Sequence, residues 1–176
     1  DAALWARLLA SEKDRREHAM AVASVTTPLA ALGTEVVAPP TPGRLALDNV
    51  QHLATEVTAR LAAPVPGLDL LDHLHPTAAV GGVPSDAALA RIRRTEGMDR
   101  GRYAGPVGWT DAAGDGEWAL TLRCAQVDGT RARVFAGAGV VAGSLPELEL
   151  QETQLKLRAM LRVLSGLAAE RPPTAD

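Results

Sequence analysis

Three strand-like segments in close succession constrain the fold of this chain more than any other feature of its sequence. They cover residues 103–109, 118–127 and 131–136, and turn-forming residues separate them at 111–116 and 128–129. Helical patterns come before and after this meander and do not alternate with its strands. The sequence therefore predicts an α+β domain with antiparallel strands and flanking helices, not a doubly wound parallel sheet.

The helical patterns begin at polar residues that can cap a helix N-terminus. Such residues predict three helices: from Ser11 with Asp14 toward Leu32, from Ser85 over residues 86–94, and from Ser144 with Glu147 to about Leu167. The chain itself opens on a helix-like stretch without an initiator Met, and we expect further sequence before residue 1. The polar, Pro-containing residues 171–176 are expected to be a disordered tail.

Composition argues against several classes of protein. The net charge is −3 with no basic stripe, and aromatic residues make up 3% of the chain, so no nucleic-acid partner is expected. The single cysteine, Cys124, excludes a disulfide within the chain and favours a reducing cytoplasm. No apolar run approaches the roughly 20 residues that span a bilayer, so no membrane partner is expected.

The last predicted helix has a charged face. Glu149 and Glu152 lie three residues apart, and Lys156 follows Glu152 by four, so the three side chains point the same way. Mg²⁺ takes oxygen ligands and keeps several waters, so one or two carboxylates on such a face can contribute to a metal site. A solvated helix face with an i,i+4 ion pair explains the same pattern.

Other charged positions leave the same choice open. Residues 11–18 form a dense charged run that includes Glu17, and either an exposed helix start or a ligand group accounts for it. Arg123 is expected on a strand face beside Ala119 and Ala125. A guanidinium there needs either solvent or an anionic partner such as a carboxylate.

Residues 74–82, Leu-His-Pro-Thr-Ala-Ala-Val-Gly-Gly, are unusual for a surface loop. Paired glycines let backbone N–H groups come close to a ligand, but a tight turn requires them equally well. None of these features decides a function separately.

Taken together and in chain order, six motifs resemble those of chorismate-utilising enzymes. They are Ser-Glu-Lys-Asp-Arg-Arg-Glu-His at 11–18, Val-Gln-His-Leu at 50–53, Leu-His-Pro-Thr at 74–77, Asp-Arg-Gly-Arg-Tyr-Ala-Gly-Pro-Val-Gly-Trp at 99–109, Gly-Ala-Gly-Val-Val at 137–141 and Ser-Leu-Pro-Glu-Leu-Glu-Leu-Gln-Glu-Thr at 144–153. The resemblance implies the family's fold of layered antiparallel sheets with flanking helices. Residues 1–170 would then be about the C-terminal half of its catalytic domain.

The resemblance also implies site residues. Glu17 and Glu152 match the family's Mg²⁺-binding glutamates, and Glu149 matches a nearby acid. The positions that match substrate-binding residues are His52, Ala79, Tyr103, Arg123, Phe135, Gly137 and Lys156. By the same resemblance, Mg²⁺ is the expected cofactor, chorismate and isochorismate are the expected small-molecule partners, and the protein is expected to be a monomer.

Ala79 favours the isochorismate synthase branch, whose members resemble this sequence in having alanine there. That branch moves the hydroxyl group of chorismate from C4 to C2, for menaquinone or siderophore biosynthesis. Two alternatives stay open: a salicylate or anthranilate/aminodeoxychorismate synthase-like enzyme, and a truncated module that binds chorismate without catalysis. The family's general-base lysine and general-acid glutamate would lie upstream of residue 1, so no catalytic acid or base is assigned within this chain.

Overall fold

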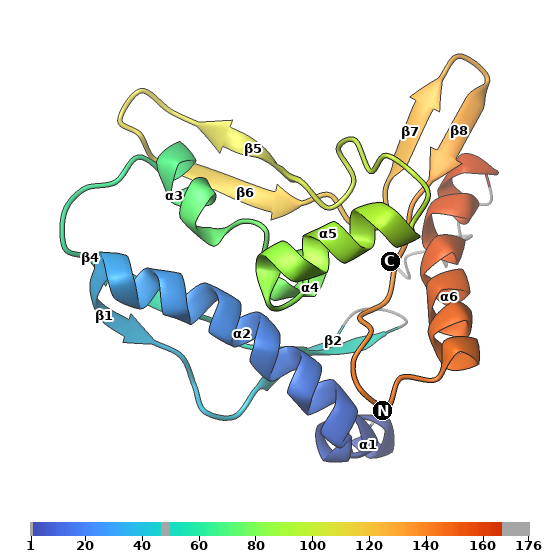
Figure 1. The fold of residues 1–176 in the computed structure, drawn as a ribbon, viewed down its shortest axis with the longest axis horizontal. Coiled ribbons are helices and arrows are strands. Elements are labelled where there is room, and N and C mark those ends of the chain that lie inside the picture. Colours follow the sequence, from blue (N-terminus) through green and yellow to red (C-terminus); the bar gives the residue numbers. More distant parts are fainter. Residues whose placement is uncertain (1, 47–49, 167–176) are drawn as a thin grey trace, which may run out of the picture.

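The computed structural model describes residues 2–46 and 50–166, and these ranges fold into helices and short strands (Figure 1). The helices are α1 (Ala2–Ala10), α2 (Glu12–Leu32), α3 (Gly67–Leu74), α4 (Ala78–Gly81), α5 (Ser85–Thr95) and α6 (Pro146–Leu164). The strands are β1 (Gly33–Val37), β2 (Gly43–Ala46), β3 (Gln51–Ala54), β4 (Thr58–Leu61), β5 (Pro106–Thr110), β6 (Gly116–Leu120), β7 (Ala125–Asp128) and β8 (Arg131–Val134).

Every described strand pairs antiparallel with one partner, which confirms the α+β prediction. The pairs are β1 with β4, β2 with β3, β5 with β6, and β7 with β8. Each strand has one partner, so each keeps one edge without a strand neighbour in the described part of the chain. Isolated two-stranded hairpins are marginally stable in water, so these ladders need the helices, or further chain, to hold them.

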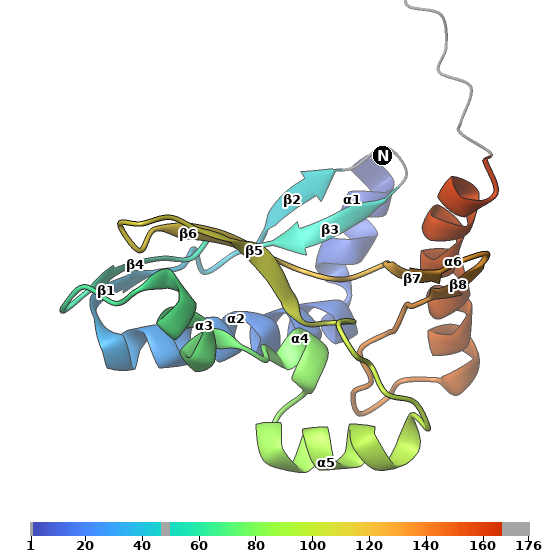
Figure 2. The ribbon, with the colours of Figure 1, turned by 90° about the horizontal axis from the view of Figure 1, so that it is seen from above.

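An early helix, α2, and the last helix, α6, come together in the fold. Figure 1 shows the segment after β8 running back toward the start of α2 before α6 begins. Viewed from above, α6 stands at one side of the molecule next to β7 and β8 (Figure 2). This course brings the first turns of α2 and the first turns of α6 into contact, although 136 residues separate Lys13 from Glu149.

The start and end of α2 follow the sequence prediction. The hydroxyl of Ser11 accepts a hydrogen bond from the backbone N–H of Asp14 at 3.3 Å, as a capping residue does. At the other end, a Cβ on Gly33 would lie 2.8 Å from the Arg60 carbonyl oxygen and 2.9 Å from that of Leu29. Glycine is therefore required where the helix turns directly into β1.

The two other predicted caps are wrong. Ser85 is the first residue of α5, whose N-cap is Pro84, and no side chain caps this helix. At α6 the N-cap is Leu145, and the Ser144 hydroxyl accepts instead from the N–H of Val141 at 3.1 Å. Pro146 explains the later start, because its fixed φ suits the first helical position. The expected helix end at Leu167 and the predicted tail 171–176 lie outside the described residues.

The predicted strand over residues 118–127 is also wrong, because it is two strands. Between β6 and β7 the backbone of Arg123 adopts a φ of 49°, in the left-handed region that an ordinary side chain rarely occupies. A strand cannot continue through such a residue, so Arg123 does not lie on the expected strand face. Strain of this kind is held only where the surroundings fix it, and functional sites are common places for it.

Little of the described chain is buried. The buried hydrophobic residues are Leu29, Ala104 and Phe135, and no described side chain falls below 2% exposure. Large apolar side chains are exposed along β5 and along α6, among them Val107, Trp109, Leu148, Leu150, Leu155 and Leu161. Exposed apolar side chains that form a large patch often mark surfaces that other protein covers. No helix within residues 2–46 and 50–166 is both long and apolar enough to cross a membrane.

Candidate active site

Helix α2 and helix α6 bring two of the predicted metal-binding glutamates together. The Lys13 ammonium lies 2.5 Å from Glu149 Oε1 and 3.5 Å from Glu17 Oε1. Lys13 and Glu17 are four residues apart, so they share one face of α2, and α6 supplies Glu149 opposite them. Glu149 is the one charged residue in the buried class within the described chain, at 8% exposure.

The two carboxyl groups differ in their environments. Burial raises the pKa of Glu17 above its usual value, and the Lys13 charge offsets only part of that effect. Burial acts in the same direction on Glu149. The pKa of Glu149 is nevertheless lowered, because several favourable interactions outweigh burial. They are hydrogen bonds from Lys13 and Ser144 and the charges of Lys13 and Lys156. The pKa of Lys13 is raised in turn, chiefly by its hydrogen bond to Glu149.

Two oxygens of this acidic pair are buried and make no hydrogen bond, although one of them lies 3.5 Å from the Lys13 ammonium. They are Glu17 Oε1 and Glu149 Oε2. Glu17 Oε2 faces the glycine-rich segment after β8, since a Cβ on Gly139 would lie 3.1 Å from it. Buried carboxylate oxygens without donors are costly, so this site has unfilled capacity for a cation.

Glu152, the third predicted metal ligand, takes a different partner in this structure. It forms an ion pair of 2.6 Å with Lys156, one turn further along α6. Among residues 2–46 and 50–166, no group of three or more acidic, histidine or cysteine side chains is close enough to hold a metal ion. The role of Glu152 as a metal ligand stays a prediction.

Lys156 and Tyr103 meet at Gly137. The Lys156 ammonium donates to the Gly137 carbonyl oxygen at 3.0 Å. A Cβ on Gly137 would lie 2.7 Å from the Tyr103 hydroxyl oxygen. The Tyr103 ring stacks on Phe135, with centroids 5.2 Å apart and planes at 19°. The structure therefore gathers four of the predicted substrate-binding residues around one stretch of backbone.

Arg123 and His52 form a second contact between predicted site residues. Arg123 Nη2 lies 3.2 Å from His52 Nε2. A guanidinium can only donate, so His52 Nε2 accepts and the ring is neutral with its proton on Nδ1. Burial, together with the charges of Arg123 and Lys156, lowers the pKa of His52.

Ala79 lies in α4, and its side chain is exposed. This helix is held to α2 by the backbone N–H of Ala78, which donates to the Ser24 hydroxyl at 2.9 Å. The glycine pair that follows has packing reasons: a Cβ on Gly81 would lie 2.9 Å from Pro76, and Gly82 has a φ of 76°. A tight turn accounts for these glycines.

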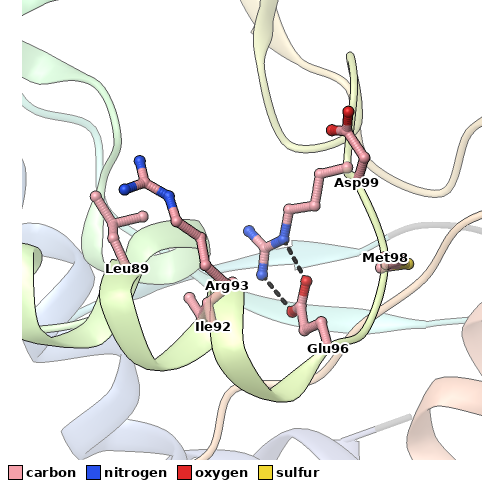
Figure 3. A pocket seen from close by; sticks show the side chains of 7 residues that line it. Leu89, Ile92, Arg93, Glu96, Met98 and Asp99 are labelled. Atoms are coloured by element: carbon pink, nitrogen blue, oxygen red, sulfur yellow. Dashed lines mark hydrogen bonds and ion pairs between the residues drawn. The ribbon is translucent and has the colours of Figure 1, made fainter.

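A shallow cavity of about 300 Å³ lies between α5 and the loop after it (Figure 3). None of the predicted site residues lines it. Glu96, labelled in Figure 3, forms an ion pair with Arg100, which also lines the cavity, with an N–O distance of 2.6 Å. The Arg100 guanidinium also lies 5.6 Å from the centroid of the Tyr103 ring. This cation–π contact helps to position Tyr103, one of the predicted substrate-binding residues.

Comparison with known proteins decides the family. The model of the chorismate binding enzyme family matches residues 1–165. The chain belongs to this family. A protein of Pseudomonas aeruginosa named salicylate biosynthesis isochorismate synthase is 47% identical over 167 residues, which are 95% of this chain. An isochorismate synthase of Bacillus subtilis is 45% identical over 160 residues, which are 90% of this chain.

The fold of this chorismate-binding chain agrees with solved structures of relatives. A protein of Bacillus anthracis described as a 2,3-dihydroxybenzoate-specific isochorismate synthase superimposes with a TM-score of 0.89 at 42% identity, over 94% of this chain. Anthranilate synthase component I of Streptococcus pneumoniae gives 0.84 at 34% identity, over 92% of this chain. The predicted fold class and family are confirmed.

This chorismate-binding chain is short beside its relatives. It spans 35% and 40% of the length of the two curated relatives and 44% and 38% of the two solved chains.

One residue of this site was not among the predicted ligands. Lys13 was expected only as one member of the charged run at residues 11–18. Its i,i+4 spacing to Glu17 was a detectable pattern. Its closer partner, Glu149, lies 136 residues away, and no local pattern indicates that contact.

Proposed function

We propose that the protein is an isochorismate synthase that converts chorismate to isochorismate with Mg²⁺. This chain would supply the metal-binding carboxylates and the cationic groups that hold the substrate. The observation that supports this most is the acidic pair Glu17 and Glu149 within reach of the Lys156 charge, with Lys156 and Arg123 both near His52. The isochorismate synthases among its relatives, at 45% and 47% identity, support the same reaction.

The acidic cluster fits a divalent metal ion by its chemistry. Mg²⁺ binds through one or two carboxylates and completes its shell with water and substrate oxygens. Glu17 Oε1 and Glu149 Oε2 are buried and make no hydrogen bond, so they can serve as ligands. Glu152 is proposed to join them directly or through water. When bound, Mg²⁺ would offer positive charge to the ring carboxylate of chorismate and hold it in place.

The cationic groups fit the second carboxylate of chorismate, on its enolpyruvyl arm. Arg123 presents a guanidinium that can bind a carboxylate through two hydrogen bonds. Lys156 is held beside Gly137 and offers a second charge. The Tyr103 hydroxyl is placed against the same glycine, where it can donate to the same carboxylate. Phe135 and His52 are proposed to line the site around them.

In the proposed reaction, water adds to C2 of the ring while the hydroxyl group leaves C4 and the ring double bonds shift between them. A base takes the proton of the attacking water, and an acid gives a proton to the leaving hydroxyl. The residues of this chain hold both carboxylates and so fix the ring relative to those groups. The acid and the base are proposed to come from sequence upstream of residue 1.

The remaining part of the catalytic domain is the proposed partner of this chain. Apolar side chains are exposed on β5 and α6, and each described strand has one partner. Sequence equivalent to the rest of the longer relatives would cover these faces and edges. The product would serve menaquinone or siderophore biosynthesis.

An anthranilate or salicylate synthase-like activity is the second candidate. The likeness to anthranilate synthase component I, at 34% identity, favours it to a lesser degree. Alanine at position 79 argues against it, by resemblance to the isochorismate branch.

Product analysis of the full-length protein separates these candidates. Chorismate is incubated with the protein and an ammonium salt, in the presence of Mg²⁺ or of a chelator, and the products are identified by chromatography and NMR. Isochorismate that forms only with Mg²⁺, without pyruvate, is the expected result. Pyruvate with salicylate or an aminated product would assign the protein to the other branch, and binding of chorismate without turnover would contradict both enzymatic assignments.

A further inference from the structure

Lys13 occupies the position between the two buried glutamates. Its ammonium contacts Glu149 at 2.5 Å and Glu17 at 3.5 Å, and it reaches them from α2. A lysine ammonium is a compact single charge on a flexible stem. It thus neutralises part of a site that contains two carboxylates.

Lys13 neutralises only part of the negative charge of Glu17 and Glu149. Lys13 donates a hydrogen bond to Glu149 Oε1 and lies at ion-pair distance from Glu17 Oε1, but Glu17 Oε1 and the other oxygen of Glu149 are buried and make no hydrogen bond. Oxygens left in this state favour a cation of higher charge that contacts both carboxylates. The Lys13 side chain is 35% exposed, so a path to solvent is open to it while the Glu149 side chain, at 10%, stays enclosed.

We propose that Lys13 is an internal counter-ion that competes with the divalent metal for the Glu17–Glu149 site. Without metal, its ammonium holds α2 and α6 together through the two carboxylates. When the metal binds, the ammonium leaves Glu149 and turns toward solvent, because two cations on the same oxygens repel each other. This inference rests on the proposed metal site and adds that the affinity for metal is set by a residue that is not a ligand.

The test is the affinity of the full-length protein for Mg²⁺ alone, measured by calorimetry without chorismate. The variants are Lys13→Met, which keeps the length of the side chain and removes its charge, and Lys13→Arg, which keeps the charge. Arg16→Met is the matched control, because Arg16 lies on the same helix and forms its ion pair with the exposed Glu12, at 2.8 Å.

We expect Lys13→Met to bind Mg²⁺ roughly tenfold or more tightly than wild type, as expected when a competing charge is removed. Lys13→Arg should bind no more tightly than wild type, and Arg16→Met should stay within about twofold of it. In chelator, Lys13→Met should also have a lower Tm than wild type, and saturating Mg²⁺ should reverse the difference. Unchanged or weaker binding by Lys13→Met would overturn the inference.

Two further outcomes separate this inference from the proposed function. If wild type binds Mg²⁺ and Glu17→Gln abolishes that binding while Lys13→Met has no effect, only the role of Lys13 is wrong. If neither wild type nor Lys13→Met binds Mg²⁺, the proposed metal site is wrong as well. Should Lys13→Met fail to fold, a crystal structure of the wild-type protein with Mg²⁺ decides: the contact between Lys13 and Glu149 must be broken in it, and an intact contact would refute the inference.

Discussion

The Tyr103 hydroxyl oxygen lies 2.7 Å from the position that a Cβ on Gly137 would occupy. The missing side chain at Gly137 therefore lets the tyrosine reach the backbone to which Lys156 also donates. The stacked ring of Phe135 prevents Tyr103 from moving away freely. Two of the predicted substrate-binding positions thus depend on each other sterically.

Gly137→Ala should destabilise the protein by about 1–3 kcal/mol, because an added methyl group must displace a packed ring. It should also raise KM for chorismate. Tyr103→Phe combined with Gly137→Ala should recover part of the lost stability, since the atom in conflict is the hydroxyl oxygen. Gly43→Ala is the control, with its nearest contact at 3.6 Å. Thermal unfolding measures all of them, and equal losses in the single and double variants would contradict this contact.

Lys156→Met should raise KM for chorismate by about 10- to 100-fold, the range expected for a lost hydrogen bond to a charged group. It should change Mg²⁺ affinity less than Lys13→Met does, because Lys156 pairs with Glu152 and Gly137 and acts on Glu149 only through its charge. Arg158→Met is the control, because it removes an exposed cation from the same helix. Steady-state kinetics and calorimetry separate the two effects. If Lys156→Met weakened only Mg²⁺ binding and left KM for chorismate unchanged, the proposed role of Lys156 in binding chorismate would be wrong.

Acidic pH should weaken the Arg123–His52 contact. The pKa of His52 is lowered by burial and by the nearby cations, so the folded protein binds this proton less readily than the unfolded chain. The stability contributed by neutral His52 is therefore present above the unfolded pKa of about 6.5 and is lost as the pH falls below it. His18, whose pKa is also lowered by burial, adds to the same trend.

The Tm of His52→Gln should fall less than that of wild type when the pH is lowered from about 7 to about 5. Glutamine cannot gain a proton there and can still accept from Arg123. His73→Gln, at an exposed position, should follow the wild-type profile. If His52→Gln and wild type had parallel profiles, His52 would not be the group responsible.

Residues 1–176 expressed alone should not turn over chorismate. By resemblance, the family's acid and base lie upstream of residue 1, and exposed apolar side chains on β5 and α6 should promote aggregation of the isolated chain. Turnover of chorismate at the rate of the full-length protein would contradict this expectation, and a product assay with both proteins measures it.

Local patterns predicted much of the fold, because helix caps, turns and periodicity are properties of neighbouring residues. Ser11 capped α2, and the turn at Asp128-Gly129 joined β7 to β8 as expected. The break at Arg123 could not be predicted in this way, because no local pattern marks a positive φ at an arginine. The start of α6 was misplaced because Pro146 outweighs the spacing of Ser144.

For the site, the charged face of α6 was visible in the spacing of its glutamates, and the resemblance supplied candidate roles. Sequence spacing could not predict which acidic side chain forms an ion pair with which lysine. Glu152 pairs with Lys156 as the i,i+4 rule predicts, whereas Glu149 is buried against Lys13 from the other end of the chain. Contacts across so many residues depend on the completed fold.

The most direct test of the central claim is the rate of isochorismate formation as a function of Mg²⁺ concentration, in full-length wild type, Glu17→Gln and Glu12→Gln. Glu12 lies on the same helix one turn earlier and is exposed, with Arg16 as its partner. We predict that wild type and Glu12→Gln share one Mg²⁺ dependence, and that Glu17→Gln needs far more Mg²⁺ or is inactive. Isochorismate formation that is independent of Mg²⁺, or unaffected by Glu17→Gln, would contradict the proposal that the Glu17–Glu149 pair holds the metal.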